Sequence, residues 1–112
     1  VSFDMDPICK EVKLFSNVTY QTSTIEDFDP TPYDIIICTS CEHITDDVIN
    51  GFISKKRKDS VVVLQSNDYY YITDHINCKV NSSDFANKIN MKVLEEHTLP
   101  LEKYNRFMLI GL

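Results

Sequence analysis

Short apolar runs alternate with amphipathic segments along the whole chain. The apolar runs are brief and rich in β-branched residues, which is typical of strands, and we expect six of them at 1–3, 18–22, 34–37, 60–65, 92–97 and 106–111. The amphipathic segments carry apolar residues at helical spacing, and we expect three helices at 7–15, from 45 to about 58, and from 82 or 83 to about 89. The predicted order is therefore strand, helix, strand, strand, helix, strand, helix, strand, strand.

The helix that begins at Thr45 has the clearest signals. Asp46 and Asp47 lie at its positive end and the basic run 55–58 lies at its negative end, which suits the helix dipole. Its buried stripe is expected to be Val48, Ile49, Phe52 and Ile53. The basic run is thereby explained as a helix terminus rather than as a binding patch.

The alternation of strands and helices predicts a single α/β domain over residues 1–112, with a mostly parallel sheet and helices on both of its faces. The run at 34–37 has no polar alternation, which is typical of a strand that is buried on both sides. The last two strands follow one another across a link that contains Pro100. They suit an antiparallel pair at the edge of the sheet.

Charge and composition narrow the class of partner. The net charge of −6 argues against nucleic acid, because binding to phosphates needs clustered Lys and Arg. No apolar run approaches the roughly 18 residues of a membrane span, so we expect no membrane partner. Two of the four cysteines lie in or beside apolar strand patterns, where a free thiol packs as a small hydrophobe, and we expect a reducing, cytoplasmic setting.

A polar cluster follows the third predicted strand, at the end of the strand where an open α/β sheet binds its ligands. Glu42 and His43 are its distinctive members, because histidine transfers protons near neutral pH and a neighbouring carboxylate can orient it. The alternative is that Glu42 simply suits a helix N-terminus and His43 is a surface residue. Asp74 and His75 form a second candidate pair in the long polar segment 66–80, where three consecutive tyrosines could wall a substrate pocket.

Cys38 and Cys41 form a Cys-x-x-Cys pair, which occurs in redox sites and as half of a zinc site. Cys78 with His75 or His43 could complete a zinc set. Against this, Cys38 lies in an apolar strand pattern and the chain has no second Cys-x-x-Cys. We therefore expect Cys38 to be buried and unreactive, and we expect no bound metal.

Four segments, taken in order, resemble the class I S-adenosylmethionine-dependent methyltransferases. They are Phe3-Asp4-Met5-Asp6-Pro7, Tyr33-Asp34-Ile35-Ile36-Ile37-Cys38, Cys41-Glu42-His43-Ile44 and Tyr104-Asn105-Arg106-Phe107-Met108-Leu109-Ile110-Gly111. In order, they are similar to the family's second strand, its fourth strand, the Glu-His pair after that strand, and the closing antiparallel strand. The resemblance implies a Rossmann-like fold, S-adenosylmethionine as cofactor and a small-molecule nucleophile as methyl acceptor.

The resemblance also implies roles for particular residues. Asp4, at the end of a strand, would accept hydrogen bonds from the ribose hydroxyls of the cofactor, as carboxylates do in dinucleotide sites. A plain turn and cap role is the alternative. The other implied cofactor contacts are Met5, Ser23, Thr24, Thr39 and Ser40. The implied catalytic residues are Glu42, His43 as candidate base, and His75.

The family's first strand and its glycine-rich loop have no counterpart, because the only glycines are Gly51 and Gly111. In that family the first strand lies at the sheet centre, between the second and the fourth. We therefore expect the strands at 1–3 and 34–37 either to pair directly or to take a strand from another chain or an upstream segment. Two further hypotheses stand beside the enzyme: a non-catalytic interaction module with the same fold, and a redox or zinc protein built on the Cys-x-x-Cys pair.

Overall fold

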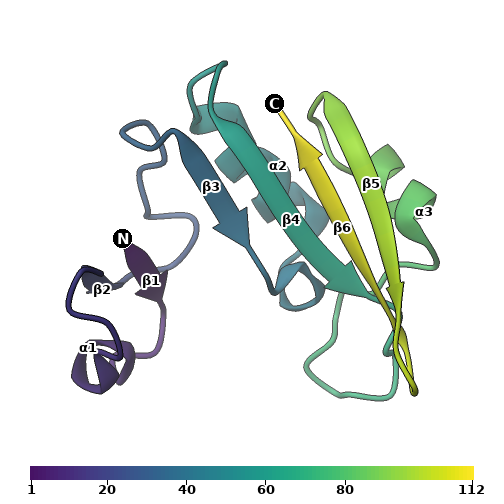
Figure 1. Ribbon diagram of the computed structural model, residues 1–112, viewed down its shortest axis with the longest axis horizontal. Helices are drawn as coiled ribbons and strands as arrows, with labels where there is room; N and C mark the ends of the chain where they lie inside the picture. Colours follow the sequence, from purple (N-terminus) through teal and green to yellow (C-terminus); the bar gives the residue numbers. More distant parts are fainter.

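The computed structural model describes all of residues 1–112 and contains six strands and three α-helices (Figure 1). The strands are β1 (Ser2–Asp4), β2 (Tyr20–Thr22), β3 (Ile35–Cys38), β4 (Val61–Asn67), β5 (Val93–Pro100) and β6 (Asn105–Gly111). The helices are α1 (Cys9–Val12), α2 (Asp46–Lys55) and α3 (Ser82–Lys88), and a 3₁₀ turn, η1 (Cys41–His43), follows β3. Each expected strand and helix is present in the expected order, although several boundaries differ.

The strands form two sheets instead of one. β1 and β2 make a parallel pair, and the larger sheet has the order β3-β4-β6-β5. In the larger sheet β3 and β4 are parallel, whereas β6 runs antiparallel to both β4 and β5. The α/β class and the antiparallel C-terminal pair are thus confirmed. The prediction of a single, mostly parallel sheet is not, because the larger sheet contains only one parallel pair.

Helices α2 and α3 both cover the same face of the larger sheet (Figure 1). They share one core cluster with β4 and β6, made of Cys41, Ile49, Ile53, Val62, Leu64, Phe85, Ile89, Phe107 and Leu109. The prediction of helices on both faces is therefore wrong. On the uncovered face Ile35 and Ile37 of β3 are 62% and 63% exposed, because successive side chains of a strand point to opposite faces of a sheet.

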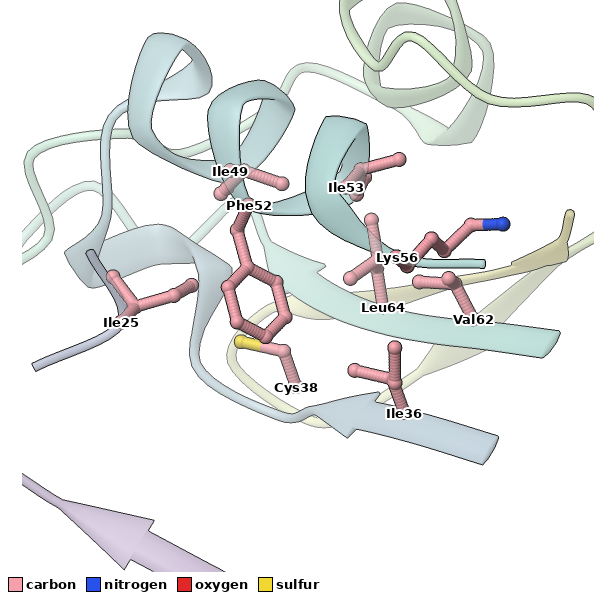
Figure 2. Close-up of a pocket in the computed structure, with 9 residues that line it drawn as sticks. All are labelled: Ile25, Ile36, Cys38, Ile49, Phe52, Ile53, Lys56, Val62 and Leu64. Carbon is pink, nitrogen blue, oxygen red and sulfur yellow. The ribbon is translucent and has the colours of Figure 1, made fainter. Parts of the chain in front are cut away.

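Helix α2 forms where the local signals are strongest. Thr45 is its N-cap, and the Thr45 hydroxyl accepts a hydrogen bond from the Val48 N–H at 3.4 Å. Ile49, Phe52 and Ile53 are buried against β3 and β4 (Figure 2), and each such side chain contributes roughly 1.5–3 kcal/mol of hydrophobic stabilisation. The space left between helix and strands is only about 10 Å³ and is lined by apolar side chains, so it is a packing gap rather than a ligand site.

Helix α1 is much shorter than the predicted helix at 7–15. It ends at Lys13, which adopts the left-handed conformation with a φ of 32°. The apolar side chains that predicted the longer helix, Ile8 and Phe15 among them, are more than half exposed. Short helices are marginal without tertiary packing, so apolar spacing alone did not produce three turns. Asp6 does act near the helix start, since its carboxylate accepts the Ile8 N–H at 3.0 Å.

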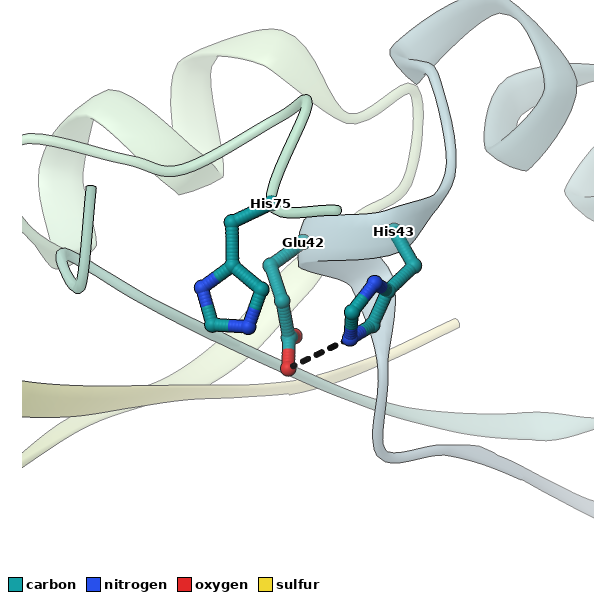
Figure 3. A group of neighbouring side chains, drawn as sticks. All are labelled: Glu42, His43 and His75. Carbon is teal, nitrogen blue, oxygen red and sulfur yellow. Dashed lines mark ion pairs between the residues drawn. The ribbon is translucent and has the colours of Figure 1, made fainter. Parts of the chain in front are cut away.

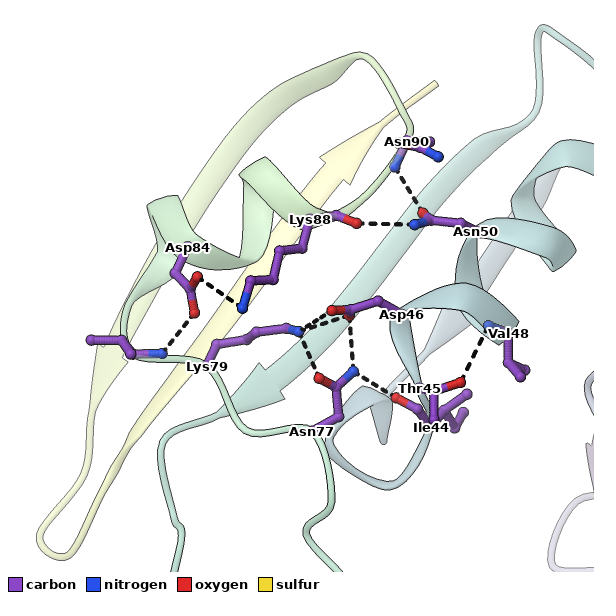
Figure 4. A network of polar contacts seen from close by, with 11 residues as sticks. Ile44, Thr45, Asp46, Val48, Asn50, Asn77, Lys79, Asp84, Lys88 and Asn90 are labelled. Carbon is purple, nitrogen blue, oxygen red and sulfur yellow. Dashed lines mark hydrogen bonds and ion pairs between the residues drawn. The ribbon is translucent and has the colours of Figure 1, made fainter.

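The segment between β4 and α3 is fixed by a buried lysine (Figure 4). Lys79 is fully buried, and its Nζ donates to both carboxylate oxygens of Asp46 at 2.7 and 2.9 Å. Nζ also donates to Oδ1 of Asn77 at 2.8 Å, so each ammonium proton has an acceptor, as a buried charge requires. Because Asp46 is the first residue of α2, this network attaches the segment to the start of that helix.

We predict that Lys79→Met lowers the free energy of unfolding by about 3 kcal/mol, because losing one partner of a buried ion pair leaves the other uncompensated. We take the low end of the usual range since the Asp46 side chain is 26% exposed. Equilibrium unfolding in urea measures the change. Lys88→Met is the matched control: Lys88 pairs with Asp84 on one exposed turn of α3 at 3.4 Å, and its loss should cost less than about 0.5 kcal/mol. Equal losses in the two variants would contradict the special role of Lys79.

Candidate functional site

Glu42, His43 and His75 come together just beyond the end of β3 (Figure 3). One oxygen or nitrogen atom from each side chain lies within 4.8 Å of the corresponding atoms of the other two. The two imidazole rings meet edge to face, with centres 4.8 Å apart. The sequence presented Glu42 with His43 and Asp74 with His75 as separate candidates, whereas the structure places the two histidines and Glu42 in one site.

Asn77 brings His75 to η1. The Asn77 N–H donates to the Glu42 carbonyl at 2.9 Å, and the Asn77 side-chain amide donates to the Ile44 carbonyl at 2.7 Å. Lys79 in turn donates to the Asn77 side chain. The buried network of Figure 4 therefore positions the site as well as the helix.

Both histidines are oriented by backbone carbonyls. Nδ1 of His43 lies 2.9 Å from the Asp74 carbonyl oxygen, and Nδ1 of His75 lies 2.8 Å from the Tyr69 carbonyl oxygen. A carbonyl oxygen can only accept, so each Nδ1 carries a proton and each Nε2 of the neutral ring keeps its lone pair. In Figure 3 the outer ring nitrogen of each histidine is turned toward the Glu42 carboxylate.

Glu42 is almost completely buried, with 5% of its surface exposed. Its Oε2 atom has no hydrogen-bond partner. Its Oε1 atom lies 3.8 Å from Nε2 of His43, which is beyond hydrogen-bonding distance. Buried carboxylate oxygens are normally paired, so this site has unused acceptor capacity. A simple helix-terminus role does not account for that burial.

Tyr69 is the member of the tyrosine run that backs the site. The centre of its ring lies 6.2 Å from that of His75, and it stacks on Tyr104 at 4.8 Å. Tyr71 is almost fully exposed. One tyrosine therefore walls the site and another is free at the surface.

The residues implied as cofactor contacts fall into two groups. One group, at the carboxyl end of the small sheet, comprises Asp4, Met5, Ser23 and Thr24. The other, between β3 and η1, comprises the exposed residues Thr39 and Ser40. The Asp4 carboxylate accepts the Asp6 N–H at 2.9 Å and makes no other hydrogen bond. This is the turn role considered as the alternative, and it leaves one carboxylate oxygen free.

A cleft lies between β1 and β3, which are not hydrogen-bonded to each other. Its lining is predominantly apolar and comprises Val1, Phe3, Phe28, Pro30, Tyr33, Ile35, Ile36, Ile37 and Phe52. The cleft has a volume of about 70 Å³, far below the roughly 300–1,000 Å³ of small-molecule pockets. A stack of Phe3 on Phe28 and of Phe28 on Tyr33 connects the small sheet to the rest of the chain. Direct pairing of the two strands, one of the two expected outcomes, does not occur.

Cys38 and Cys41 are free thiols whose Sγ atoms lie 3.6 Å apart. Cys41 is fully buried, whereas Cys38, which was expected to be buried, is only half-buried. The Cys41 thiol donates a hydrogen bond to Cys38, which lowers the pKa of Cys38 to about 7 and raises that of Cys41. Cys78 instead lies 3.6 Å from Oδ1 of Asn67, and the one candidate metal group contains no cysteine.

Two residues that build the site gave no signal in the sequence. Asn77 and Lys79 lie in a polar segment, and a buried lysine has no local pattern that distinguishes it from a solvated one. Only the length of that segment pointed to a function.

Comparison with known proteins does not assign the chain to a family. No protein-family model matches it, and no curated protein matches it. None of its helices is both long and apolar enough to cross a lipid bilayer.

We predict that Cys38 reacts with a small alkylating reagent at a rate that rises with pH around a midpoint near pH 7, because the thiolate is the nucleophile. Peptide mass spectrometry after timed labelling measures the rate at each cysteine. In Cys41→Ala the hydrogen-bond donor is gone, so the midpoint should move up toward the ordinary thiol value of about 8.5. A midpoint that is the same in both proteins would show that Cys41 does not control Cys38.

Proposed function

We propose that residues 1–112 form the larger part of a class I S-adenosylmethionine-dependent methyltransferase domain of Rossmann-like design, which methylates a small-molecule nucleophile. The strand order carries this proposal. β1 and β3 resemble the second and fourth strands of that family, and they flank a cleft at the position where the family has its first strand. Their arrows run in the same general direction in Figure 1.

We propose that a strand from outside residues 1–112 fills this cleft, supplied by another chain or by an upstream segment. The edges of β1 and β3 that face the cleft are unpaired, and open edges accept an added strand through backbone hydrogen bonds. β1 is parallel to β2 and β3 is parallel to β4. Since β1 and β3 point the same general way in Figure 1, an inserted strand would have one orientation relative to both, and the resemblance implies the parallel one.

The residues present suit one end of the cofactor only. Asp4 has a free carboxylate oxygen at a strand end, which suits ribose hydroxyls. The methionine end requires the glycine-rich loop of the family, and the two glycines of this chain lie elsewhere, Gly51 within α2 and Gly111 in β6. Together with the small cleft, this means that residues 1–112 alone do not form the whole cofactor site.

S-adenosylmethionine would supply an electrophilic methyl group, and the chain's own residues would prepare the acceptor. Nε2 of His43, with its lone pair, would take the proton from the acceptor's O–H or N–H group. Glu42 lies close enough to stabilise the imidazolium that forms. His75 and Tyr69 would wall the acceptor on the other side.

In the completed protein, that is, the chain together with the polypeptide that supplies the strand, S-adenosylmethionine should raise the melting temperature. A ligand at 100 times its dissociation constant stabilises a protein by about 2.7 kcal/mol. Asp4→Ala should remove most of this effect, because the ribose hydroxyls lose their acceptor. Asp6→Ala, in the same exposed turn, is the control and should retain the effect. Unchanged affinity of Asp4→Ala in a calorimetric titration, or tight binding by residues 1–112 alone, would refute this cofactor site.

His43→Ala should reduce methyl transfer by roughly 100-fold or more, the usual contribution of a general base, with little change in cofactor affinity. Glu42→Gln should also reduce turnover, because the imidazolium would lose the negative charge that stabilises it. Turnover with a labelled methyl donor measures both. His97→Ala is the control, because His97 pairs with a glutamate on the exposed strand β5. Loss of cofactor binding in His43→Ala would instead make His43 a cofactor contact.

The non-catalytic interaction module is the second candidate function, and the uncovered face of the larger sheet favours it. Ile35 and Ile37 form an exposed apolar stripe beside the open edge of β3, and such patches mark interaction sites. Under this alternative the completing strand binds, but the assembled protein shows no stabilisation by S-adenosylmethionine. The melting experiment therefore separates the two functions.

A further inference from the structure

We infer that Glu42, His43 and His75 bind a divalent transition-metal ion of the Zn²⁺ class. The sequence predicted no metal because its zinc hypothesis depended on the Cys-x-x-Cys pair, and the geometry points to a different set of ligands. The inference does not rest on methyl transfer, since it concerns the side chains of this chain alone.

The donor atoms are those that such an ion requires. Two imidazole nitrogens and one carboxylate oxygen form the ligand set of a common class of zinc sites, in which the fourth position stays open for water or substrate. A ligating nitrogen must be unprotonated. The Nδ1 hydrogen bonds to the carbonyls of Asp74 and Tyr69 leave Nε2 available on both rings. Carbonyl acceptors behind metal-binding histidines are the usual device that fixes the ring and its tautomer.

The unpaired oxygen of Glu42 is an independent observation. Glu42 is buried, its Oε2 has no hydrogen-bond partner, and its carboxylate lies beside both imidazole rings. A buried carboxylate is normally paired or coordinates a metal. A cation between the three side chains would satisfy it, and no protein group does.

The distances require only a small contraction. Two ligands of a tetrahedral zinc ion, each about 2.0–2.2 Å from it, lie roughly 3.4 Å apart. Here the three donor atoms lie within 4.8 Å of one another, and Oε1 of Glu42 is 3.8 Å from Nε2 of His43. The His43 side chain is 42% exposed, so it has room to move and leaves an entry path from solvent.

The types of ligand atom also indicate which metal ions the site would prefer. Imidazole suits zinc, copper, iron and nickel, whereas calcium and magnesium prefer sites built from oxygen atoms. With an ion bound, Nε2 of His43 is a ligand and can no longer act as a base. Water at the open position would then have a pKa lowered toward 7, and the hydroxide that remains after it has lost a proton would be the group that could accept a proton.

Zinc titrated calorimetrically into residues 1–112, with no S-adenosylmethionine present, tests the inference. We expect one saturable zinc ion per chain. Replacing a residue that merely supports a ligand usually costs 10–100-fold in affinity, so His43→Ala and His75→Ala should each weaken binding by about 100-fold. Glu42→Gln keeps the shape and loses the charge, and should weaken binding as well. Circular dichroism confirms that each variant is folded, and His43→Ala is the decisive one because His43 lies outside the core.

Two controls separate this site from other zinc ligands. His97→Ala should leave affinity unchanged, because His97 and Glu95 form an exposed pair at 2.9 Å with no third ligand. The double variant Cys38→Ser with Cys41→Ser should also bind normally. Absence of saturable binding, or binding that survives His43→Ala but is lost in the cysteine variant, would overturn the inference. Zinc binding without any stabilisation of the completed protein by S-adenosylmethionine would leave the metal site intact and refute only the methyltransferase.

Discussion

The buried ion pair between Lys79 and Asp46 is the constraint on which the candidate site depends. It fixes the beginning of α2 and the end of the long segment after β4 to one another. Through Asn77 it also sets the position of His75 beside η1. An ammonium group that must satisfy three protons inside a protein tolerates little displacement, so this network holds the segment in one register. The site is therefore held by groups that do no chemistry themselves.

The larger sheet and the small sheet are stabilised to very different extents. The larger sheet shares one continuous core with α2 and α3. The small sheet has no such core, and an aromatic stack through Phe3, Phe28 and Tyr33 links it to the rest. Under the proposed function, Asp4 lies on the weakly attached half and His43 on the strongly packed half. A completing strand would then do more than add backbone hydrogen bonds. It would also hold Asp4, on the cofactor side, at a fixed distance from His43, on the acceptor side.

The elements of this fold were predictable from sequence because each has a local signal. α2 shows this best: its cap and three of its four expected stripe residues are as predicted, although Val48 is only partly buried and the helix ends at Lys55 instead of near residue 58. α1 shows the limit, because its apolar spacing was correct but the face that it predicts has no partner. Strand pairing depends on contacts between distant segments, so the split into two sheets had no local signature.

The side chains of the candidate site were predictable from the sequence, but their assembly was not. Glu42, His43 and His75 were named as candidates because of their side chains and their place beyond a strand. Their assembly into one site depends on Lys79, whose burial results from a tertiary contact with Asp46. The segment that carries Asn77 is also hydrogen-bonded to the backbone of the buried residue Glu42. Sequence patterns describe what a residue can do, and here the three-dimensional contacts decided which of the candidate residues lie together.

The open edge of β3 has a consequence for the solubility of the chain. Natural edge strands are usually protected by charges, prolines or bulges, and an unprotected apolar edge is a template for aggregation. β3 consists of three isoleucines and a cysteine, and it carries none of these protections. Left unpaired, this edge would favour association between copies of the chain. The added strand proposed above would therefore protect the chain against aggregation as well as complete its sheet.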